Sequence, residues 1–390
     1  MRDLCSHARP RALVAGLLPA ALLGMLLGCG RSTPPPAPGA SVVIPRYRGP
    51  IADVEAQWTK ALRYAPADFA LAWLRLDELV VAHHETYEAA DVAAGTCGGT
   101  GLYRVSLAPA GTPAGASGEA QPRVRPIAVG PPVCRDMGGK GYALSPDGRT
   151  LAASVRVLPN NIRLVARDIT TGQVDTLARG CRIYFEGPAW SPDGRRIAGY
   201  GQCESRQDNF ALYVTGLATS GGAAARVRRL SPAGSTDEAT PAWSPDGRAI
   251  VAVHPDTALG SWSGAIVVMD TTGQQRRVVA QGYEPVWSPD GQWIAYLRDS
   301  PGEERGERNE LRVVHPDGTG DRLVLANTVR TTMARGWGPF PEGALESPIV
   351  WAPDSRTLAF TRRYDIGRSV WRVDITGGGL AQVTRAAAAP

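Results

Sequence analysis

The feature that most constrains this chain is a short turn sequence that returns along it. It occurs as Leu144-Ser-Pro-Asp-Gly148, Trp190-Ser-Pro-Asp-Gly194, Trp243-Ser-Pro-Asp-Gly247, Trp287-Ser-Pro-Asp-Gly291 and Trp351-Ala-Pro-Asp-Ser355. Seven residues after each leading position stands an aliphatic residue, and Ala or Val follows it. Trp73 fits the same frame, with Val80 seven residues on. Internal repeats at intervals of this kind indicate a series of similar structural units.

The repeated sequence has the chemistry of a tight turn. Pro presets φ for the second turn position, Asp accepts hydrogen bonds from nearby backbone N–H groups, and Gly adopts the positive φ that closes the turn. The flanking residues are apolar or alternate over four to six positions, which is typical of strands. Each copy therefore predicts a hairpin. The turn aspartates are assigned a structural role: Asp147, Asp193, Asp246, Asp290 and Asp354.

A second hairpin is expected after each first one, as in Leu212-Tyr-Val214 and Ile266-Val-Val-Met269. Two hairpins make one four-stranded unit, and six such units are expected between residues 66 and 386. A single sheet of this kind cannot bury its Trp and aliphatic side chains, whereas radial stacking buries them between neighbours. The sequence therefore predicts an all-β fold, a six-bladed β-propeller of four-stranded antiparallel blades, with the leading Trp residues wedged between adjacent sheets.

The Trp-Ser-Pro-Asp-Gly unit with its following Ile-Ala resembles the WD-like repeat of the C-terminal propeller of TolB and its relatives. The resemblance covers most of the chain, and four strict copies of Ser-Pro-Asp-Gly carry it. TolB has an α/β domain before its propeller and is soluble in the periplasm. Here only a short segment precedes the first blade and a lipid anchor is expected, so the resemblance implies a TolB-like lipoprotein distinct from TolB itself.

The N-terminus has the pattern of an export signal. Arg2, Arg9 and Arg11 precede an apolar run from Ala12 to Leu27, which is too short for a membrane span and suits a secretory signal. The run ends in Leu26-Leu27-Gly28-Cys29, which resembles a bacterial lipobox. We expect a signal peptide over 1–28, and then lipidated Cys29, a Pro-rich tether and a short helix over 29–65. An ordinary signal peptide is the alternative. Gly30 after the Cys implies sorting to the outer membrane, facing the periplasm, in a Gram-negative host.

Four cysteines remain in the predicted exported chain beyond Cys29: Cys97, Cys134, Cys181 and Cys203. An even number in an exported protein favours disulfides. The blade map places all four in loops at one face, which predicts the pairs Cys97–Cys134 and Cys181–Cys203. Free thiols or a crossed pairing are the alternatives.

The sequence contains no convincing catalytic motif. Gly95-Thr-Cys97-Gly-Gly99 matches a nucleophile elbow only formally, because it lies between strands. His84-Glu85-Thr86-Tyr87-Glu88 lacks the second His of the zinc signature. We therefore expect no catalytic residue, metal or cofactor. The formal charge is only +5, from 42 Lys and Arg against 37 Asp and Glu. This balance is too even to imply a nucleic-acid partner, which usually leaves a basic stripe or block.

One constellation points to binding. Glu186, Glu238, Glu284 and Glu346 each lie three to five residues before a leading Trp, and Asp68 and Lys140 hold comparable places. First strands surround the central channel of a propeller, so these residues are expected at its mouth, where carboxylates would attract a cation or a basic peptide. The insertion 327–348 adds Trp337 and Phe340 between arginines and prolines, a composition typical of interface anchors. Hydrogen-bonded loop glutamates and a loop folded over its own blade are the alternatives.

The sequence favours a lipid-anchored, non-catalytic scaffold of the cell envelope that binds a protein or peptide at the channel mouth and is itself a monomer. A glycan or small-ligand sensor is the second interpretation, and a propeller enzyme such as a polysaccharide lyase is the third. Propellers serve all three purposes, so the fold alone does not decide among them.

Overall fold

The computed structural model describes residues 42–43, 67–84, 100–107, 124–127, 142–158, 161–177, 184–203, 210–217, 227–232, 238–255, 264–299, 309–326, 345–364 and 367–385. The predicted signal peptide, Cys29 and the helix expected near residues 51–62 lie outside these ranges. None of the described residues forms a helix long and apolar enough to cross a bilayer. Within these ranges the chain forms strands joined by turns, as the repeats predict.

Two sheets contain four antiparallel strands each. One is built from β6 (Tyr142–Leu144), β7 (Thr150–Leu158), β8 (Asn161–Asp168) and β9 (Val174–Thr176). The other is built from β10 (Tyr184–Trp190), β11 (Arg196–Gln202), β12 (Ala211–Gly216) and β13 (Val227–Arg229). In both sheets the strands follow one another in chain order, so each sheet is two hairpins side by side.

A seven-stranded sheet follows. Its strands are β14 (Ala239–Trp243), β15 (Ala249–Pro255), β16 (Gly264–Asp270), β17 (Arg277–Trp287), β18 (Ile294–Asp299), β19 (Asn309–Val314) and β20 (Arg322–Ala326). The long strand β17 has two roles. Arg277 to Gly282 pair with β16, whereas Tyr283 to Trp287 pair with β18. The outer strand of one four-stranded group thus continues directly into the first strand of the next.

The eight-stranded sheet joins the two ends of the described chain. Its order is β21 (Leu345–Trp351), β22 (Thr357–Tyr364), β23 (Gly367–Asp374), β2 (Ala67–Arg75), β3 (Glu78–His84), β4 (Thr100–Ser106) and β5 (Val124–Pro126), with β24 (Ala381–Gln382) beside β23. A single parallel pair, Ala67 with Arg368, links β23 to β2. Beyond β24, β25 (Thr384–Arg385) pairs in parallel with β1 (Val42–Val43).

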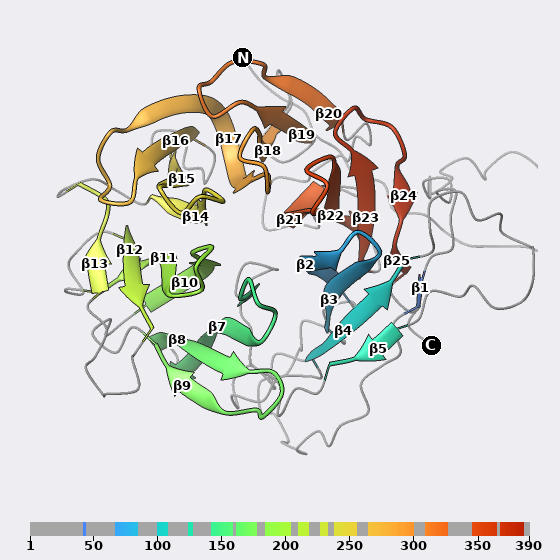
Figure 1. Ribbon diagram of the computed structural model, residues 1–390, viewed down its shortest axis with the longest axis horizontal. Coiled ribbons are helices and arrows are strands. Elements are labelled where there is room, and N and C mark those ends of the chain that lie inside the picture. Colours follow the sequence, from blue (N-terminus) through green and yellow to red (C-terminus); the bar gives the residue numbers. More distant parts are fainter. Residues whose placement is uncertain are drawn as a thin grey trace, which may run out of the picture. The chain divides into compact units, whose positions relative to one another are not determined.

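The first strands of successive groups contact one another all the way round. β2 contacts β6, β6 contacts β10, β10 contacts β14, β14 contacts β17, β17 contacts β21, and β21 returns to β2. Figure 1 shows the labelled strands arranged around a centre, with β2, β10, β14, β17 and β21 nearest to it. The fold is therefore an all-β, propeller-like arrangement of four-stranded antiparallel sheets, which confirms the predicted class.

The repeated turns form as their chemistry predicts. In the turn after β14, Ser244 Oγ donates to Asp246 Oδ1 at 2.6 Å, and the backbone N–H of Arg248 donates to the same oxygen at 3.0 Å. The glycine that closes this turn, Gly247, has φ of 70°. Ser145 with Asp147, Ser191 with Asp193, and Ser288 with Asp290 repeat the hydroxyl-to-carboxylate bond at 2.5 Å. These carboxylates organise the turns that contain them.

The leading Trp side chains join neighbouring sheets. The indole Nε1–H of Trp190 donates to the carbonyl of Ala143 at 2.9 Å, that of Trp243 to Ala189 at 3.1 Å, and that of Trp351 to Val286 at 3.2 Å. Each acceptor lies in the first strand of the preceding group, so the wedge expected from the sequence is present at these three positions.

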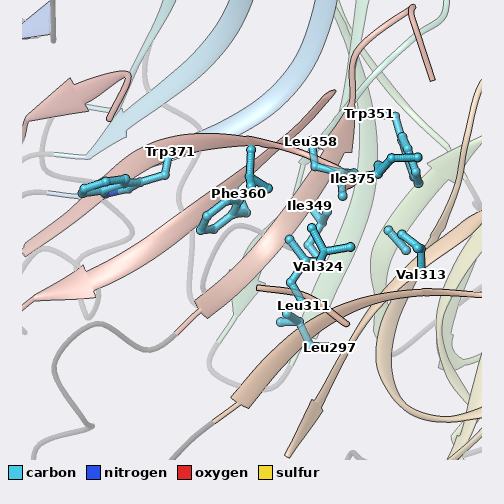
Figure 2. Close-up of a cluster of buried hydrophobic side chains, with 12 residues drawn as sticks. Leu297, Leu311, Val313, Val324, Ile349, Trp351, Leu358, Phe360, Trp371 and Ile375 are labelled. Atoms are coloured by element: carbon cyan, nitrogen blue, oxygen red, sulfur yellow. The ribbon is translucent and has the colours of Figure 1, made fainter. Parts of the chain in front are cut away.

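Apolar clusters fill the spaces between sheets. In one of them, side chains of β18, β19 and β20 meet those of β21, β22 and β23, and Figure 2 shows residues such as Leu297, Ile349 and Phe360 facing into this layer. Leu297 and Phe360 are at most 1 % exposed. Burying one side chain of this size contributes about 1.5–3 kcal/mol, so contacts between sheets, and not single sheets, stabilise the fold.

The first hairpin departs from the expected frame. Trp73 pairs with Leu79, whereas Trp190 pairs with Ile197 and Trp243 with Ile250. The turn at Leu76 and Asp77 is one residue shorter than a Ser-Pro-Asp-Gly turn, so Leu79 takes the aliphatic position that the sequence assigned to Val80. The shorter turn also decides which residues face each other further along β2 and β3.

Candidate functional site

The acidic residues proposed for the channel mouth lie at the beginnings of the first strands. Asp68 is in β2, Glu186 in β10 and Glu346 in β21, while Glu238 immediately precedes β14 and Glu284 lies within β17. Their backbones thus occupy the same end of strands that surround the centre in Figure 1. The side chains of Glu186 and Glu346 are outside the described set, as are Trp337, Phe340 and Lys140.

Glu238 does not fit an open channel mouth. Its side chain is 2 % exposed, and its carboxylate is paired with Arg276 and accepts a hydrogen bond from Ser231 Oγ at 2.6 Å. His254 Nδ1 lies 3.5 Å from the same carboxylate. Burial lowers the pKa of Arg276. Glu238 is therefore a neutralised structural acid, because Arg276 pairs with its carboxylate and Ser231 donates a hydrogen bond to it.

Asp68 is also buried, with a different environment. Its Oδ1 lies 2.6 Å from His83 Nδ1, and the exposed fractions of the two side chains are 0 % and 1 %. Asp68 Oδ2 and His83 Nε2 have no hydrogen-bond partner. A carboxylate that orients an imidazole is half of a catalytic triad, but such a base must reach a nucleophile and substrate, and this pair is enclosed between sheets.

Glu284 occupies a strained backbone position. Its φ is 57°, and Thr240 in the neighbouring first strand has φ of 50°. Both precede a Pro, and both stand where the strand register skips, between Tyr283 and Val286 in β17 and between Ala239 and Ala242 in β14. A positive φ is uncommon for any residue other than Gly and is an outlier for β-branched Thr.

The same position in β10 is Gly187, with φ of 56° and a register skip between Glu186 and Ala189. Three adjacent first strands therefore share one left-handed kink, three residues before the leading Trp, and only one of them uses the residue suited to it. Replacing Gly by an L-residue in this conformation costs about 1–2 kcal/mol. Thr240 and Glu284 thus place a hydroxyl and a carboxylate at a conformational cost.

The surroundings of Glu284 are acidic and polar. Both Glu284 and Thr240 are partly exposed, but the hydroxyl Oγ1 of Thr240 is itself buried and has no hydrogen-bond partner. The neighbouring Tyr283 hydroxyl accepts a hydrogen bond from Asn309 Nδ2 at 3.1 Å and lies 3.4 Å from Asp299. Burial, with Asp299 and then Glu284 adding negative charge, raises the pKa of Tyr283 above its usual value. Asp299 and Glu284 therefore make the electrostatic potential at the Tyr283 hydroxyl negative.

Sequence reasoning selected Glu284 but missed two features. The left-handed kink at Thr240 could have been suspected from the recurrence of a Pro two residues before the leading Trp in Gly187-Pro-Ala-Trp190, Thr240-Pro-Ala-Trp243 and Glu284-Pro-Val-Trp287. The Asp68–His83 pair was missed because it depends on the shortened turn. The described residues contain no group of three or more His, Cys, Asp or Glu side chains placed to hold a metal ion.

Of the predicted disulfide cysteines, only Cys203 is described. Its side chain is 7 % exposed. Cys97, Cys134 and Cys181 lie outside the described residues, so both pairings stay predictions.

No family model matches this chain. Similar solved structures include TolB from Agrobacterium tumefaciens, at 19 % identity and TM-score 0.48, which covers 76 % of this chain and 87 % of that one. TolB from Acinetobacter baumannii is 13 % identical with TM-score 0.47, and covers 82 % of this chain and 83 % of that one. An oligogalacturonate lyase in complex with manganese is 12 % identical with TM-score 0.47, over 82 % and 78 %. A shared fold does not establish activity, so function rests on this chain's own residues.

Proposed function

We propose that this chain is a lipid-anchored, TolB-like propeller of the cell envelope that binds a protein or peptide without catalysing a reaction. In this proposal Cys29 carries the lipid, the outer membrane holds the protein on its periplasmic side, and the mature protein is a monomer. The binding residues lie where the first strands begin, with Glu284 at their centre and Glu186, Glu346, Trp337 and Phe340 around it. The cysteines pair as Cys97–Cys134 and Cys181–Cys203.

The proposal includes a count of six blades. It is supported by the division of β17 between two partners and by the single residue pair between β23 and β2. If each is a boundary between blades, the seven-stranded sheet becomes two groups that share β17, and the eight-stranded sheet becomes two groups of four strands. Together with the two separate four-stranded sheets, this gives six.

The observation that carries the binding proposal is the strain at Thr240 and Glu284. Backbone outliers persist where the surrounding structure imposes them, and they concentrate at ligand-binding positions. Gly187 indicates that the kink itself needs no side chain. A carboxylate at the equivalent place in β17 therefore suits a partner that presents ammonium, guanidinium or backbone N–H groups.

The test is affinity capture of the full-length lipidated protein from its own envelope membranes, followed by mass spectrometry of what co-purifies. We expect a reproducible envelope protein with the wild type and a clear loss with Glu284→Gln, which removes the charge and keeps the side-chain shape. Glu284→Gly should also lose capture, while its stability is unchanged or raised by up to about 1 kcal/mol, because the strain is relieved.

Asp175→Asn is the matched control, since it removes a carboxylate from an exposed residue of the outer strand β9. It should leave capture intact. Equal capture by the wild type and both Glu284 variants would reject Glu284 as a binding residue. Bound sugar without any protein would favour the sensor interpretation over the scaffold.

A further inference from the structure

A short strand from the N-terminal part of the chain lies outside the propeller sheets. β1 pairs in parallel with β25, with Val42 opposite Thr384 and Val43 opposite Arg385, and these two strands form a sheet of their own. Residues 44–66 stand between β1 and β2 in the sequence. The chain therefore pairs with its own end before it enters the first hairpin, and Figure 1 shows β1 beside β25.

β25 is also held to the core, through residues other than its pairing with β1. The backbone N–H of Val370 in β23 donates to Thr384 Oγ1 at 3.0 Å, and Thr384 is fully buried. The N–H of Val383 donates to the carbonyl of Val370 at 2.8 Å. Gln382 Nε2 donates to the carbonyl of Thr384 at 2.9 Å. β25 thus contacts β23 on the core side and β1 through its backbone.

The residue before β25 completes the core where the two ends of the described chain meet. Val383 is 1 % exposed and packs in one cluster with Ala70 of β2 and Val81 of β3. β23 also makes the parallel pair of Ala67 with Arg368 that joins it to β2. Displacing β25 would therefore withdraw Val383 from this core and expose apolar surface to water, which is unfavourable.

The pairing of β1 is short enough to open on its own. Two residues form only a few backbone hydrogen bonds, each with a small net contribution to stability, and an isolated two-stranded pair is marginally stable in water. Among the described strands, β25 is the one that pairs with β1. β1 can therefore separate without dismantling any sheet of the propeller.

We infer that β1 is a releasable strap that couples the N-terminal arm, residues 29–41, to the closure of the propeller. In the paired state the strap holds β25 against β23 and so keeps Val383 in the closing core. In the released state β24 and β25 open more often, while the other sheets stay folded. The strap lies between Cys29 and β2 in the sequence, so a pull on the arm reaches β25 before it reaches the first hairpin.

The experiment is hydrogen–deuterium exchange of the full-length protein at neutral pH, with the double variant Val42→Pro and Val43→Pro. Proline has no N–H to donate and holds φ at roughly −65°, away from strand values, so β1 should no longer pair. Peptides from β24 and β25 should then exchange on the order of tenfold faster, while peptides from β10 to β13 keep their protection. Ala37→Pro is the matched control, because it adds a proline to the same arm outside β1, and it should change neither.

Coupling between two sites acts in both directions, which provides a second variant. Thr384→Val keeps the shape of the side chain and removes the oxygen that accepts the N–H of Val370, so it should speed exchange of the peptide that contains β1. Thr361→Val is its control. Thr361 is also fully buried, but its Oγ1 has no hydrogen-bond partner, so the loss of this hydroxyl should leave β1 unchanged.

In the wild type, the peptide that contains Val42 and Val43 should exchange more slowly than an unstructured chain, and this measurement decides the question even if a variant does not fold. Exchange at the unstructured rate would overturn the strap. So would unchanged protection of β24 and β25 in the double proline variant, or an equal loss of protection at β10 to β13. Repeating the series with Cys29→Ser separates the strap from the proposed anchor, because the strap should persist without the lipid.

Discussion

Ser244 and Asp246 show how one repeat distributes the hydrogen bonds of its turn. Ser244 Oγ accepts the backbone N–H of Ala249 at 2.8 Å and donates to Asp246. In the last repeat Ala352 replaces the serine, and Asp354 itself accepts the equivalent N–H, that of Thr357, at 2.8 Å. The aspartate is thus common to both turns. The serine can be replaced where the carboxylate itself accepts the backbone N–H that the serine otherwise accepts.

We predict that Ser244→Ala lowers the free energy of unfolding by about 1–2 kcal/mol at neutral pH, because the N–H of Ala249 and the carboxylate of Asp246 both lose a partner. The Ser244 hydroxyl is the largest cause that lowers the pKa of Asp246, followed by the backbone N–H of Arg248. A carboxyl group whose pKa is lower in the folded protein than in the unfolded chain stabilises the fold at pH values above its unfolded pKa. That stabilisation is lost as the pH falls through its folded pKa.

The difference between Ser244→Ala and wild type should therefore shrink below about pH 4, near the ordinary range of Asp. Urea unfolding at several pH values measures it. Ala352→Ser is the matched control and should change stability little, since the N–H of Thr357 is already bonded. A loss that does not vary with pH would contradict the coupling between Ser244 and Asp246.

At the scale of elements, the sequence predicted the positions of the hairpins better than it predicted which residues face each other across paired strands. Ser-Pro-Asp-Gly fixes a turn locally, so the strands on both sides could be placed from the residues alone. The shortened turn at Leu76 and Asp77 lacks this sequence, and one missing residue changes the pairing of β2 with β3. Because of that shift Asp68 faces His83, a pairing that the expected frame did not contain.

Burial of the candidate acids was equally beyond local sequence. Glu238 and Glu346 have the same spacing from their leading Trp residues, and that spacing does not predict the contacts of Glu238 with Arg276 and Ser231. Arg276 reaches Glu238 from the segment just before β17 in the same sheet, and Ser231 from the residues after β13 of the preceding sheet, so both contacts require strand pairing and packing of the sheets. The carboxylates could be assigned to one end of the first strands, whereas which of them remain available depends on tertiary contacts.

The indole hydrogen bonds between sheets give the element-scale prediction. Trp243→Phe should lower the free energy of unfolding by roughly 1 kcal/mol more than Trp287→Phe, because Trp243 Nε1–H is bonded to Ala189 and that of Trp287 has no partner. Arg196 also lies over the Trp243 ring at 4.5 Å, which adds to the difference. Thermal and urea unfolding of the two variants measure it. Equal losses of stability in the two variants would show that the hydrogen bond from Trp243 to Ala189 adds nothing beyond the packing of the indole ring.

At the scale of the whole molecule, the end of the chain completes the sheets at its beginning. Ala381 in β24 is 5 % exposed, and Val383 directly after this strand is 1 % exposed. Val383 packs in the cluster that contains Ala70 and Val81 of the first hairpin. The backbone N–H of Val383 donates to Val370 at 2.8 Å. The last residues of the described chain thus close a core that begins at β2.

A chain ending at Gly379 should therefore lose much more free energy of unfolding than the pairing of two short strands alone contributes. It would expose the apolar side of β23 and remove the Thr384 hydroxyl from the N–H of Val370, so we expect a loss of at least about 3–4 kcal/mol. Chemical unfolding followed by Trp fluorescence measures this loss. A chain ending at Arg385 keeps every described strand and should unfold like the full-length protein. If the shorter chain matched it, closure would depend on β2 and β21 alone, since these two strands also contact each other directly.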